Sequence, residues 1–427
     1  MDELTSLLRS AVANTDFGHA PSRRVSARRL RSLYSAGERL RIYEKTVCRE
    51  HALTPLVTHL RRRLEPYANQ DMELHCGLVG YGVDYVRGVV IRRNVEDIAL
   101  LLVRAAALLT PGAAAAKFSG WLEGQPIRYK VVGLVDGLSV EEPLVLESGI
   151  EVRKASRTLP PIPGDAIIAR LPRTPRAGSA EVSFDIAARP AFFRYEDPME
   201  YGEGGKVSHT WAGGSLSTSM LHDFCEALSL SCNHCVRPVD VWQDDGDTAA
   251  FCSGSHSLGW RTIHATESSV ATPLTQELLE EAWRIYQTRR SARGLRNRVD
   301  TGVRRWVNSK RQESSLTDKF IELRVALEAL FLDNAQGESR FRLAMHGAWF
   351  LGASVEERHR YHGALLKAYQ AASVAVHGRE VHGREELLTA AQELCRDGIL
   401  KMLRVGSSPD WKALVLGGSP RRDSTQA

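Results

Sequence analysis

The chain has 427 residues, of which 43% are hydrophobic and 25% are charged, and it carries a net charge of +5. These values are typical of a soluble globular protein with two or three domains. The longest apolar run, residues 98–109, is interrupted by Arg104 and is too short to cross a bilayer. Seven scattered cysteines exclude a disulfide framework, and the acidic N-terminus does not resemble a secretory signal. We therefore expect a cytoplasmic protein that does not span a membrane.

Basic residues are concentrated in two segments of the chain. Residues 1–63 carry thirteen Lys and Arg against six Asp and Glu, and residues 284–311 carry ten against Asp300 alone. Such segments favour a surface for a polyanion such as RNA. In the second segment the candidate RNA contacts are Arg304, Arg305 and Arg311. The alternative is that these residues lie on solvated helix faces and pair with acidic neighbours.

Residues 1–115 are predicted to form a helical N-terminal region of unknown role. Apolar residues recur at helical spacing in residues 4–8 and 30–34. Another helix is predicted from about Val95 to Leu109, where the sequence Thr110-Pro111-Gly112 indicates its end.

Residues 116–272 are predicted to form a β-rich middle domain. Short, β-branched segments separated by Gly or Pro indicate strands at residues 129–135, 144–146, 150–152, 166–169, 182–186, 239–242 and 260–263. Most of these strands are too close together for intervening helices, which favours antiparallel pairing. One helix is expected around Met220 to Leu228. The Gly-rich segment 202–214 is expected to be a loop, and it lacks the residues of a phosphate-binding P-loop.

Residues 273–405 are predicted to form an antiparallel helix bundle, so the expected fold class is α+β. Helical spacing indicates helices at about residues 278–286, 303–307, 316–332, 339–352, 354–369 and 385–404. The fifth of these begins with a capping box, in which Ser354 is the N-cap and Glu357 follows three residues later. Residues 406–427 are rich in Ser, Gly, Pro and Arg and are predicted to be disordered.

Two segments of the predicted bundle match a family signature. The first is the helical segment 318–331, and the second is Tyr369-Gln-Ala-Ala-Ser-Val-Ala-Val-His377-Gly378. Together they resemble the HEPN domain of the Apea-like family of prokaryotic proteins, over roughly the last third of the chain. The strands around residues 131–153 are more weakly similar to the domain that precedes HEPN in that family. The family signature is an Arg and, a few residues later, a His, with a Tyr before the Arg and a Gly after the His.

The resemblance implies a homodimer that cleaves RNA without a metal ion, within a prokaryotic defence or stress system. It places His377 in the position of the general acid or base, Ser373 in the polar position and Tyr369 in the aromatic position. Ala372 takes the position of the Arg that would grip the scissile phosphate. The chain therefore lacks half of the usual catalytic pair.

Two hypotheses remain open from the sequence. In the first, the chain is a non-catalytic or weakened module that binds RNA and dimerises. In the second, it is an active endoribonuclease in which another Arg, such as Arg379, replaces the missing one. Arg340 and His346 also have the spacing of the motif, but they fall on another predicted helix. On spacing alone, His377-Gly378 equally fits an ordinary helix C-terminus.

Four cysteines lie near one another in the sequence. Cys232 and Cys235 have the CxxC spacing of a zinc site, and Cys225 and Cys252 are the nearest further ligands. Only one pair has the required spacing, and Cys225 also fits an apolar helix position. We therefore expect free or buried thiols, and no metal or other cofactor.

Overall fold

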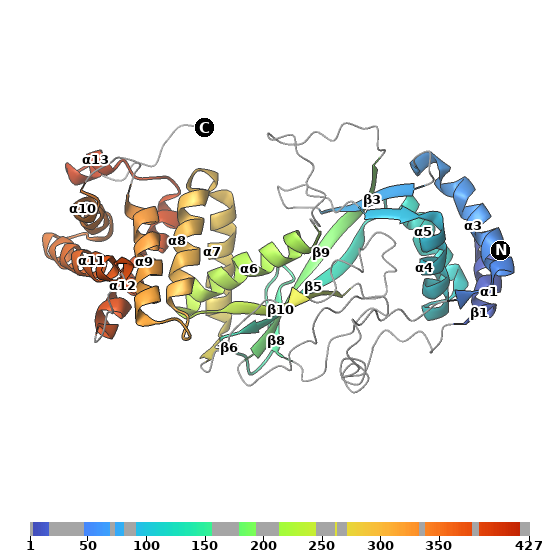
Figure 1. Cartoon of the computed structure of the whole chain (residues 1–427), viewed down its shortest axis with the longest axis horizontal. Coiled ribbons are helices and arrows are strands. Elements are labelled where there is room, and N and C mark those ends of the chain that lie inside the picture. The colour runs from blue at the N-terminus through green and yellow to red at the C-terminus, as the bar shows by residue number, and fades with distance from the viewer. Residues whose placement is uncertain are drawn as a thin grey trace.

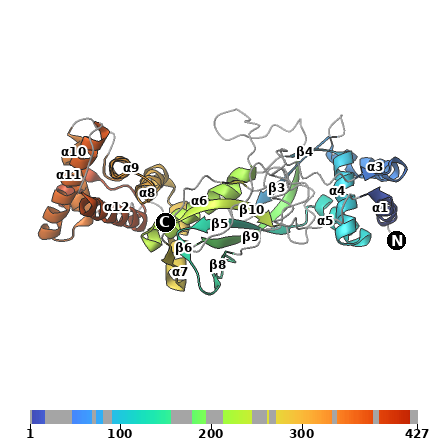
Figure 2. The same cartoon turned by 60° about the horizontal axis from the view of Figure 1, so that its bottom comes forward.

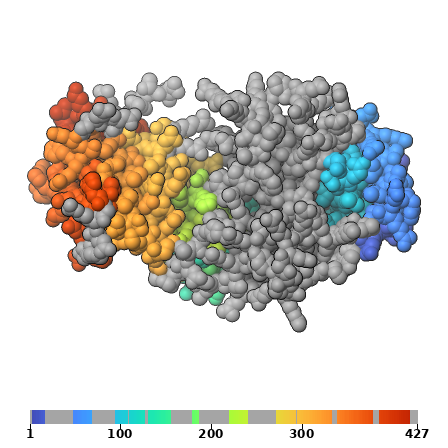
Figure 3. Space-filling model, viewed as in Figure 1, coloured from blue at the N-terminus to red at the C-terminus, as the bar shows by residue number. Residues whose placement is uncertain are grey.

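The computed structural model describes residues 3–16, 47–68, 73–80, 91–155, 179–193, 213–244, 261–262, 271–332, 338–377 and 384–418. The molecule is elongated, with helices of the N-terminal residues at one end, a sheet in the middle and the C-terminal helices at the other end (Figure 1). Figure 3 shows the surfaces of the two helical ends on opposite sides of the central part. The prediction of a mixed helix and sheet protein is confirmed. The predicted strand 166–169, Cys252, Gly378, Arg379 and residues 419–427 lie outside the described residues.

The N-terminal helices are α1 (Glu3–Ala13), α3 (Glu50–Leu64), α4 (Val95–Leu108) and α5 (Pro111–Leu122). They enclose a core of their own, which includes the buried side chains of Leu8, Leu60, Leu102 and Phe118. A short 3-10 helix (Glu65–Tyr67) follows α3, and β1 (Thr15–Asp16) pairs with β2 (Val47–Cys48).

The predicted boundary between residues 115 and 116 falls inside α5. The turn signal at Thr110-Pro111 does end α4, whose last residue is Leu108, but it also begins α5. Thr110 accepts a hydrogen bond from the Ala113 N–H at 3.1 Å, and Pro111 occupies the first turn, where its missing N–H and fixed φ favour a helix start. The two helices therefore stay in the same unit.

The main sheet is antiparallel and has the strand order β11-β10-β5-β9-β3-β4. Its strands are β3 (Glu73–Gly80), β4 (Ile91–Asn94), β5 (Ile127–Asp136), β9 (Ser179–Phe193), β10 (Arg237–Asp244) and β11 (Arg261–Thr262). The short strands β7 (Leu144–Val145) and β8 (Glu151–Lys154) extend it beside the first half of β9. The predicted antiparallel pairing is confirmed.

Two strands of this sheet, β3 and β4, come from residues that were predicted to be helical, and that prediction is wrong for them. The local sequence did not indicate β3 because this strand forms against β9, which is longer than β5 and extends beyond it. The end of β9, from Ala188 to Phe193, pairs with β3, so its backbone N–H and C=O groups are hydrogen-bonded there.

Helix α6 (Gly213–Cys232) lies along β10 and β5 (Figure 2). Gly133 of β5 permits this close approach, because a Cβ there would lie 2.2 Å from a methyl group of Leu221. Phe224 of α6 makes edge-on ring contacts with Phe184 of β9, at 5.4 Å between centroids, and with Tyr286 of α7 (Gln276–Ser291), at 5.8 Å. These aromatic contacts join the sheet to the C-terminal helices.

The C-terminal helices are α7 (Gln276–Ser291), α8 (Arg296–Ser309), α9 (Leu316–Phe331), α10 (Ser339–Leu351), α11 (Val355–Val376), α12 (Glu385–Val405) and α13 (Trp411–Val415). One continuous core extends from Val131 and Phe224 into the bundle at Trp306 and Phe331. The expected boundary at residues 272–273, where β12 (Thr272–Pro273) pairs with β6 (Leu138–Ser139), therefore does not separate two cores.

The prediction that residues from 406 onward are disordered is wrong for residues 406–418, which include α13. Asp410 caps α13 by accepting a hydrogen bond from the Ala413 N–H at 3.0 Å. Trp411 is 5% exposed and stacks on His346 with 4.8 Å between ring centroids. Burial of this large side chain holds α13 against α10, which a composition rich in Ser and Gly did not indicate.

Among the described residues, no helix combines the length and the apolar character needed to span a lipid bilayer.

Candidate functional site

A pocket with a volume of about 270 Å³ lies between α10 and α11. Its lining residues are Arg340 of α10, Tyr369, Gln370, Ser373 and Val374 of α11, and His377 at the end of α11. The pocket therefore brings together the three residues of the predicted catalytic set: Tyr369, Ser373 and His377.

The local sequence explains why these three side chains share a face. Tyr369, Ser373 and His377 are spaced four residues apart, and residues at that spacing lie above one another on a helix. Gly347 allows α10 and α11 to pack closely, because a Cβ there would lie 2.5 Å from a methyl group of Leu365. Tyr369, Ser373 and His377, which come after Leu365 on α11, therefore lie near the first turn of α10, which contains Arg340.

The predicted capping box at the start of α11 is confirmed. Ser354 Oγ accepts a hydrogen bond from the Glu357 N–H at 3.1 Å, and the Glu357 carboxylate accepts one from the Ser354 N–H at 3.4 Å and another from the Ala353 N–H at 2.8 Å. The hydrogen bonds from the backbone of Ala353 and Ser354 lower the pKa of Glu357 below its ordinary value. The cap fixes where α11 begins, and with it which of its residues face α10.

Ala372 lies on a different face of α11 from the pocket. It is 1% exposed and belongs to the main core, with Ala368, Ala371 and Ala375. An Arg at position 372 would have to enter that core, where a charged group without a partner is strongly disfavoured. Position 372 is thus a packing position in this fold.

Tyr369 is held in the wall of the pocket by Arg324 of α9. The Arg324 guanidinium lies 4.6 Å from the centre of the Tyr369 ring and donates a hydrogen bond of 3.0 Å to its hydroxyl oxygen. Glu328 accepts a hydrogen bond of 2.8 Å from the same guanidinium. Burial and the nearby Glu328 carboxylate raise the pKa of Tyr369, so its hydroxyl stays protonated near neutral pH. Tyr369 therefore presents a neutral, positioned ring to the pocket.

Arg340 and His346, which have the spacing of the family motif, do not meet in this pocket. His346 is buried on the other side of α10, where its Nδ1 donates to the Phe331 carbonyl oxygen at 2.7 Å and its ring stacks on Trp411. Burial lowers the pKa of His346, which favours its neutral form. Arg340 instead shares the pocket with His377. The sequence contains a signal for this pairing, because a connection as short as residues 352–354 makes α10 and α11 antiparallel neighbours.

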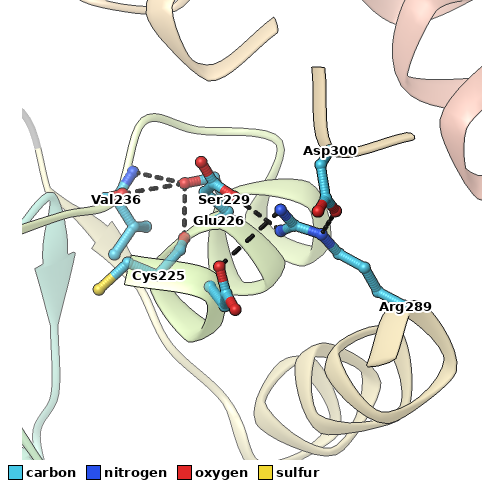
Figure 4. Close-up of polar contacts among 7 residues, drawn as sticks. Cys225, Glu226, Ser229, Val236, Arg289 and Asp300 are labelled. Carbon is cyan, nitrogen blue, oxygen red and sulfur yellow. Dashed lines mark hydrogen bonds and ion pairs between the residues drawn. The ribbon is translucent and has the colours of Figure 1, made fainter. Parts of the chain in front are cut away.

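Two basic residues of the segment 284–311, Arg289 and Arg305, pair with acidic residues of other helices, as the alternative interpretation of the sequence predicts. Arg289 of α7 is 6% exposed and forms ion pairs of 2.6 Å with Glu226 of α6 and with Asp300 of α8 (Figure 4). Burial would lower the pKa of Arg289, but the three carboxylates of Glu226, Asp300 and Asp223 outweigh this effect and raise it. Arg289 therefore stays charged and fastens three helices together.

The three Arg residues predicted to contact RNA have different environments. Arg305 forms an ion pair of 3.1 Å with Glu322 of α9. Arg304, on α8, and Arg311, which follows α8, are exposed. Of the predicted RNA contacts that the structure describes, these two have the more accessible side chains.

The described cysteines of the candidate zinc site, Cys225, Cys232 and Cys235, are buried or partly buried. Burial raises the pKa of the Cys225 thiol and raises that of Cys232 to about 11, which disfavours the thiolate that binds a metal. Within the described ranges, no group of three or more His, Cys, Asp or Glu side chains is placed to hold a metal ion. Ser229 Oγ, next to this region, accepts a hydrogen bond from the Val236 N–H at 2.9 Å and so holds the turn after α6 (Figure 4).

Comparisons of the chain with protein-family models, with curated proteins and with solved structures return no match. The site is therefore interpreted from its own geometry and chemistry.

Proposed function

We propose that this protein is a HEPN-like, RNA-binding module that dimerises through its C-terminal helices and has lost or weakened the catalytic activity of that family. The observation that carries the proposal is the pocket between α10 and α11, where Tyr369, Ser373 and His377 lie together. Imidazole, hydroxyl and aromatic groups in one pocket suit the phosphates, ribose hydroxyls and bases of RNA.

The location of Ala372 supports reduced catalysis. In HEPN ribonucleases the Arg of the motif faces the cleavage site, whereas Ala372 is buried in the core. Loss of one charged group that stabilises a transition state costs about 10²–10³ in rate. A pocket that keeps its His and loses its Arg at the usual position is suited to binding more than to rapid cleavage.

Two exposed apolar side chains that neighbour lining residues in the sequence support dimerisation. Phe341, next to Arg340, is 50% exposed, and Val376, next to His377, is 49% exposed. A second copy that covered both side chains would remove them from water. Size-exclusion chromatography with light scattering should give a dimer for the protein and a monomer for Phe341→Glu. A monomeric wild-type protein would contradict dimerisation.

The RNA-binding proposal is tested by fluorescence anisotropy with a labelled single-stranded RNA at several salt concentrations. Binding that weakens as salt rises is expected, because cationic side chains displace counterions from phosphates. His377→Ala should weaken binding severalfold, and His359→Ala, an exposed His on the same helix, should not. Equal binding by the two variants would remove the pocket from the RNA interface.

A second candidate function is metal-independent endoribonuclease activity, which the presence of Arg340 beside His377 favours. His377 would move the proton of a ribose 2′-hydroxyl or of the leaving oxygen. Incubation with tRNA and mixed RNA in EDTA tests this candidate. Cleavage by the wild-type protein and by His359→Ala, but not by His377→Ala, would replace the non-catalytic proposal by this one.

A further inference from the structure

Of the six residues that line the α10–α11 pocket, Arg340 is the one with a permanently charged side chain. Among the residues that the structure describes, the lining contains no Asp or Glu; its other members carry imidazole, hydroxyl, amide and apolar groups. A pocket with one cation, several hydrogen-bond donors and no carboxylate favours an anionic ligand. The planar guanidinium of an Arg matches two oxygens of a phosphate, which makes phosphate esters the best-fitting class of anion.

The charge of Arg340 is available to such a ligand. The neighbouring Arg324 pairs with Glu328, Arg305 pairs with Glu322, and Arg289 pairs with Glu226. Arg340 is exposed and forms no ion pair with any residue of the described ranges. A guanidinium that is already paired with a carboxylate gains less free energy from binding a phosphate. Arg340 can therefore contribute more to phosphate affinity than these three Arg residues can.

The other lining residues add contacts that a phosphate on a nucleotide would use. Ser373 and His377 offer a hydroxyl and an imidazole on the face of α11 that adjoins Arg340. The Tyr369 ring, fixed by Arg324, offers an aromatic wall for a base or a ribose. The pocket thus has a polar part for a phosphate and an aromatic part for the attached nucleoside.

We propose that this pocket is a phosphate site for single-stranded RNA, in which Arg340 of α10 grips a backbone phosphate beside His377. This inference rests on the proposed RNA-binding function and adds to it the residue that replaces the cation missing at position 372. The cation comes from a different helix because the inward face of α11 at Ala372 is used for packing.

The experiment compares the wild-type protein with Arg340→Gln, Arg340→Lys and a matched control, Lys367→Gln. Lys367 is exposed on α11 and does not line the pocket, so its variant removes the same charge from the same hairpin. Two ligands are used: a labelled single-stranded RNA, followed by anisotropy as salt is varied, and inorganic pyrophosphate, followed through the NMR signals of the His377 ring. Arg340 is exposed, so Arg340→Gln should fold normally, and circular dichroism checks this.

Arg340→Gln should lower RNA affinity about tenfold and reduce the slope of log K against log salt by about 0.7, the value for one phosphate contact on a single strand. Arg340→Lys should restore part of the affinity, because a Lys keeps the charge without the planar fork. Lys367→Gln should match the wild-type protein. Pyrophosphate should shift the His377 ring signals in the wild-type protein and not in Arg340→Gln.

Other outcomes separate this inference from the proposed function. If the wild-type protein binds RNA and Arg340→Gln behaves like Lys367→Gln, the phosphate site is overturned and RNA binding stands. If RNA does not bind but pyrophosphate shifts His377 in an Arg340-dependent manner, the phosphate site stands and the RNA-binding proposal fails. If neither ligand binds, both are overturned.

Discussion

The basic segment 284–311 and the pocket between α10 and α11 use arginine in opposite ways. The segment carries ten basic residues, yet Arg289 and Arg305 are paired with carboxylates of other helices. The pocket has a single Arg, and Arg340 forms no ion pair with any residue that the structure describes. The number of charges in a sequence segment therefore does not by itself locate a candidate binding site. An Arg is available to bind an anionic ligand only if its charge is not already neutralised by a carboxylate within the fold.

The largest expected effect follows from breaking the ion pairs of Arg289. Arg289→Met should lower the free energy of unfolding by about 3–5 kcal/mol, because it leaves Glu226 and Asp300 without their common partner. Urea unfolding followed by circular dichroism measures this change. Arg290→Met is the matched control: the neighbouring Arg only contacts Tyr286, and its loss should cost about 1 kcal/mol or less. Equal effects of the two changes would show that Arg289 is not a structural residue.

The second prediction tests the difference between the core face and the pocket face of α11. Ala372→Arg should destabilise the protein by about 3 kcal/mol, since the side chain overpacks the core and brings in a charge, and it should not create RNA cleavage. Gln370→Arg adds the same charge to the pocket and should leave stability unchanged while strengthening RNA binding. Thermal unfolding and RNA anisotropy measure both variants. A stable, cleaving Ala372→Arg protein would contradict the assignment of this position to packing.

A smaller effect is expected from the exposed part of the basic segment. Arg304→Gln combined with Arg311→Gln should weaken RNA binding about two- to threefold and lower the salt slope by at most about 1.4, the value for two phosphate contacts on a single strand, because both side chains are accessible to phosphates. Arg305→Gln should leave both quantities unchanged, since Glu322 already neutralises its guanidinium. An unchanged slope in the double variant would exclude this segment from the RNA interface.

The smallest effect is expected at the start of α11. The pKa of Glu357 is lowered in the fold, so its carboxylate stabilises the protein above the unfolded pKa of about 4.3, and this contribution is lost as pH falls through the folded pKa. Glu357→Gln should therefore be slightly less stable than the wild-type protein at pH 7, and the difference should shrink as pH falls through the folded pKa of Glu357. Thermal unfolding over this pH range measures the difference. A difference that grows on acidification would contradict the capping role.

Much of the fold was predictable because local signals and tertiary contacts agree. The capping box at Ser354 and Glu357 predicts where α11 begins, and the structure has the helix start there. The apolar spacing of residues 316–331 likewise predicts α9. Helix α13 was not predictable from composition, since one buried Trp411 outweighs its polar neighbours. Strands β3 and β4 were not predictable either, because β3 pairs with β9, a partner distant in the sequence, and β4 pairs with β3.

The candidate site was predictable only along one helix. The four-residue spacing of Tyr369, Ser373 and His377 places them on one face wherever the helix forms. The presence of Arg340 beside them depends on how α10 packs against α11, which involves Gly347 and Leu365 rather than any spacing in the motif. The burial of Ala372 likewise depends on the core that α11 shares with the other helices.

The aromatic contact between Phe224 and Tyr286 also determines how this protein can be divided. Because one core extends from the sheet into the C-terminal helices, a fragment that starts at residue 273 would expose Tyr286 and the adjacent Trp283 to water. The sheet, α6 and the bundle therefore form one folding unit. Genetic recombination could not exchange the sheet and the bundle as separate modules. The helices that enclose Leu8 and Phe118 have a core of their own, but β3 and β4, which lie between α3 and α4 in the chain, connect them to the main sheet.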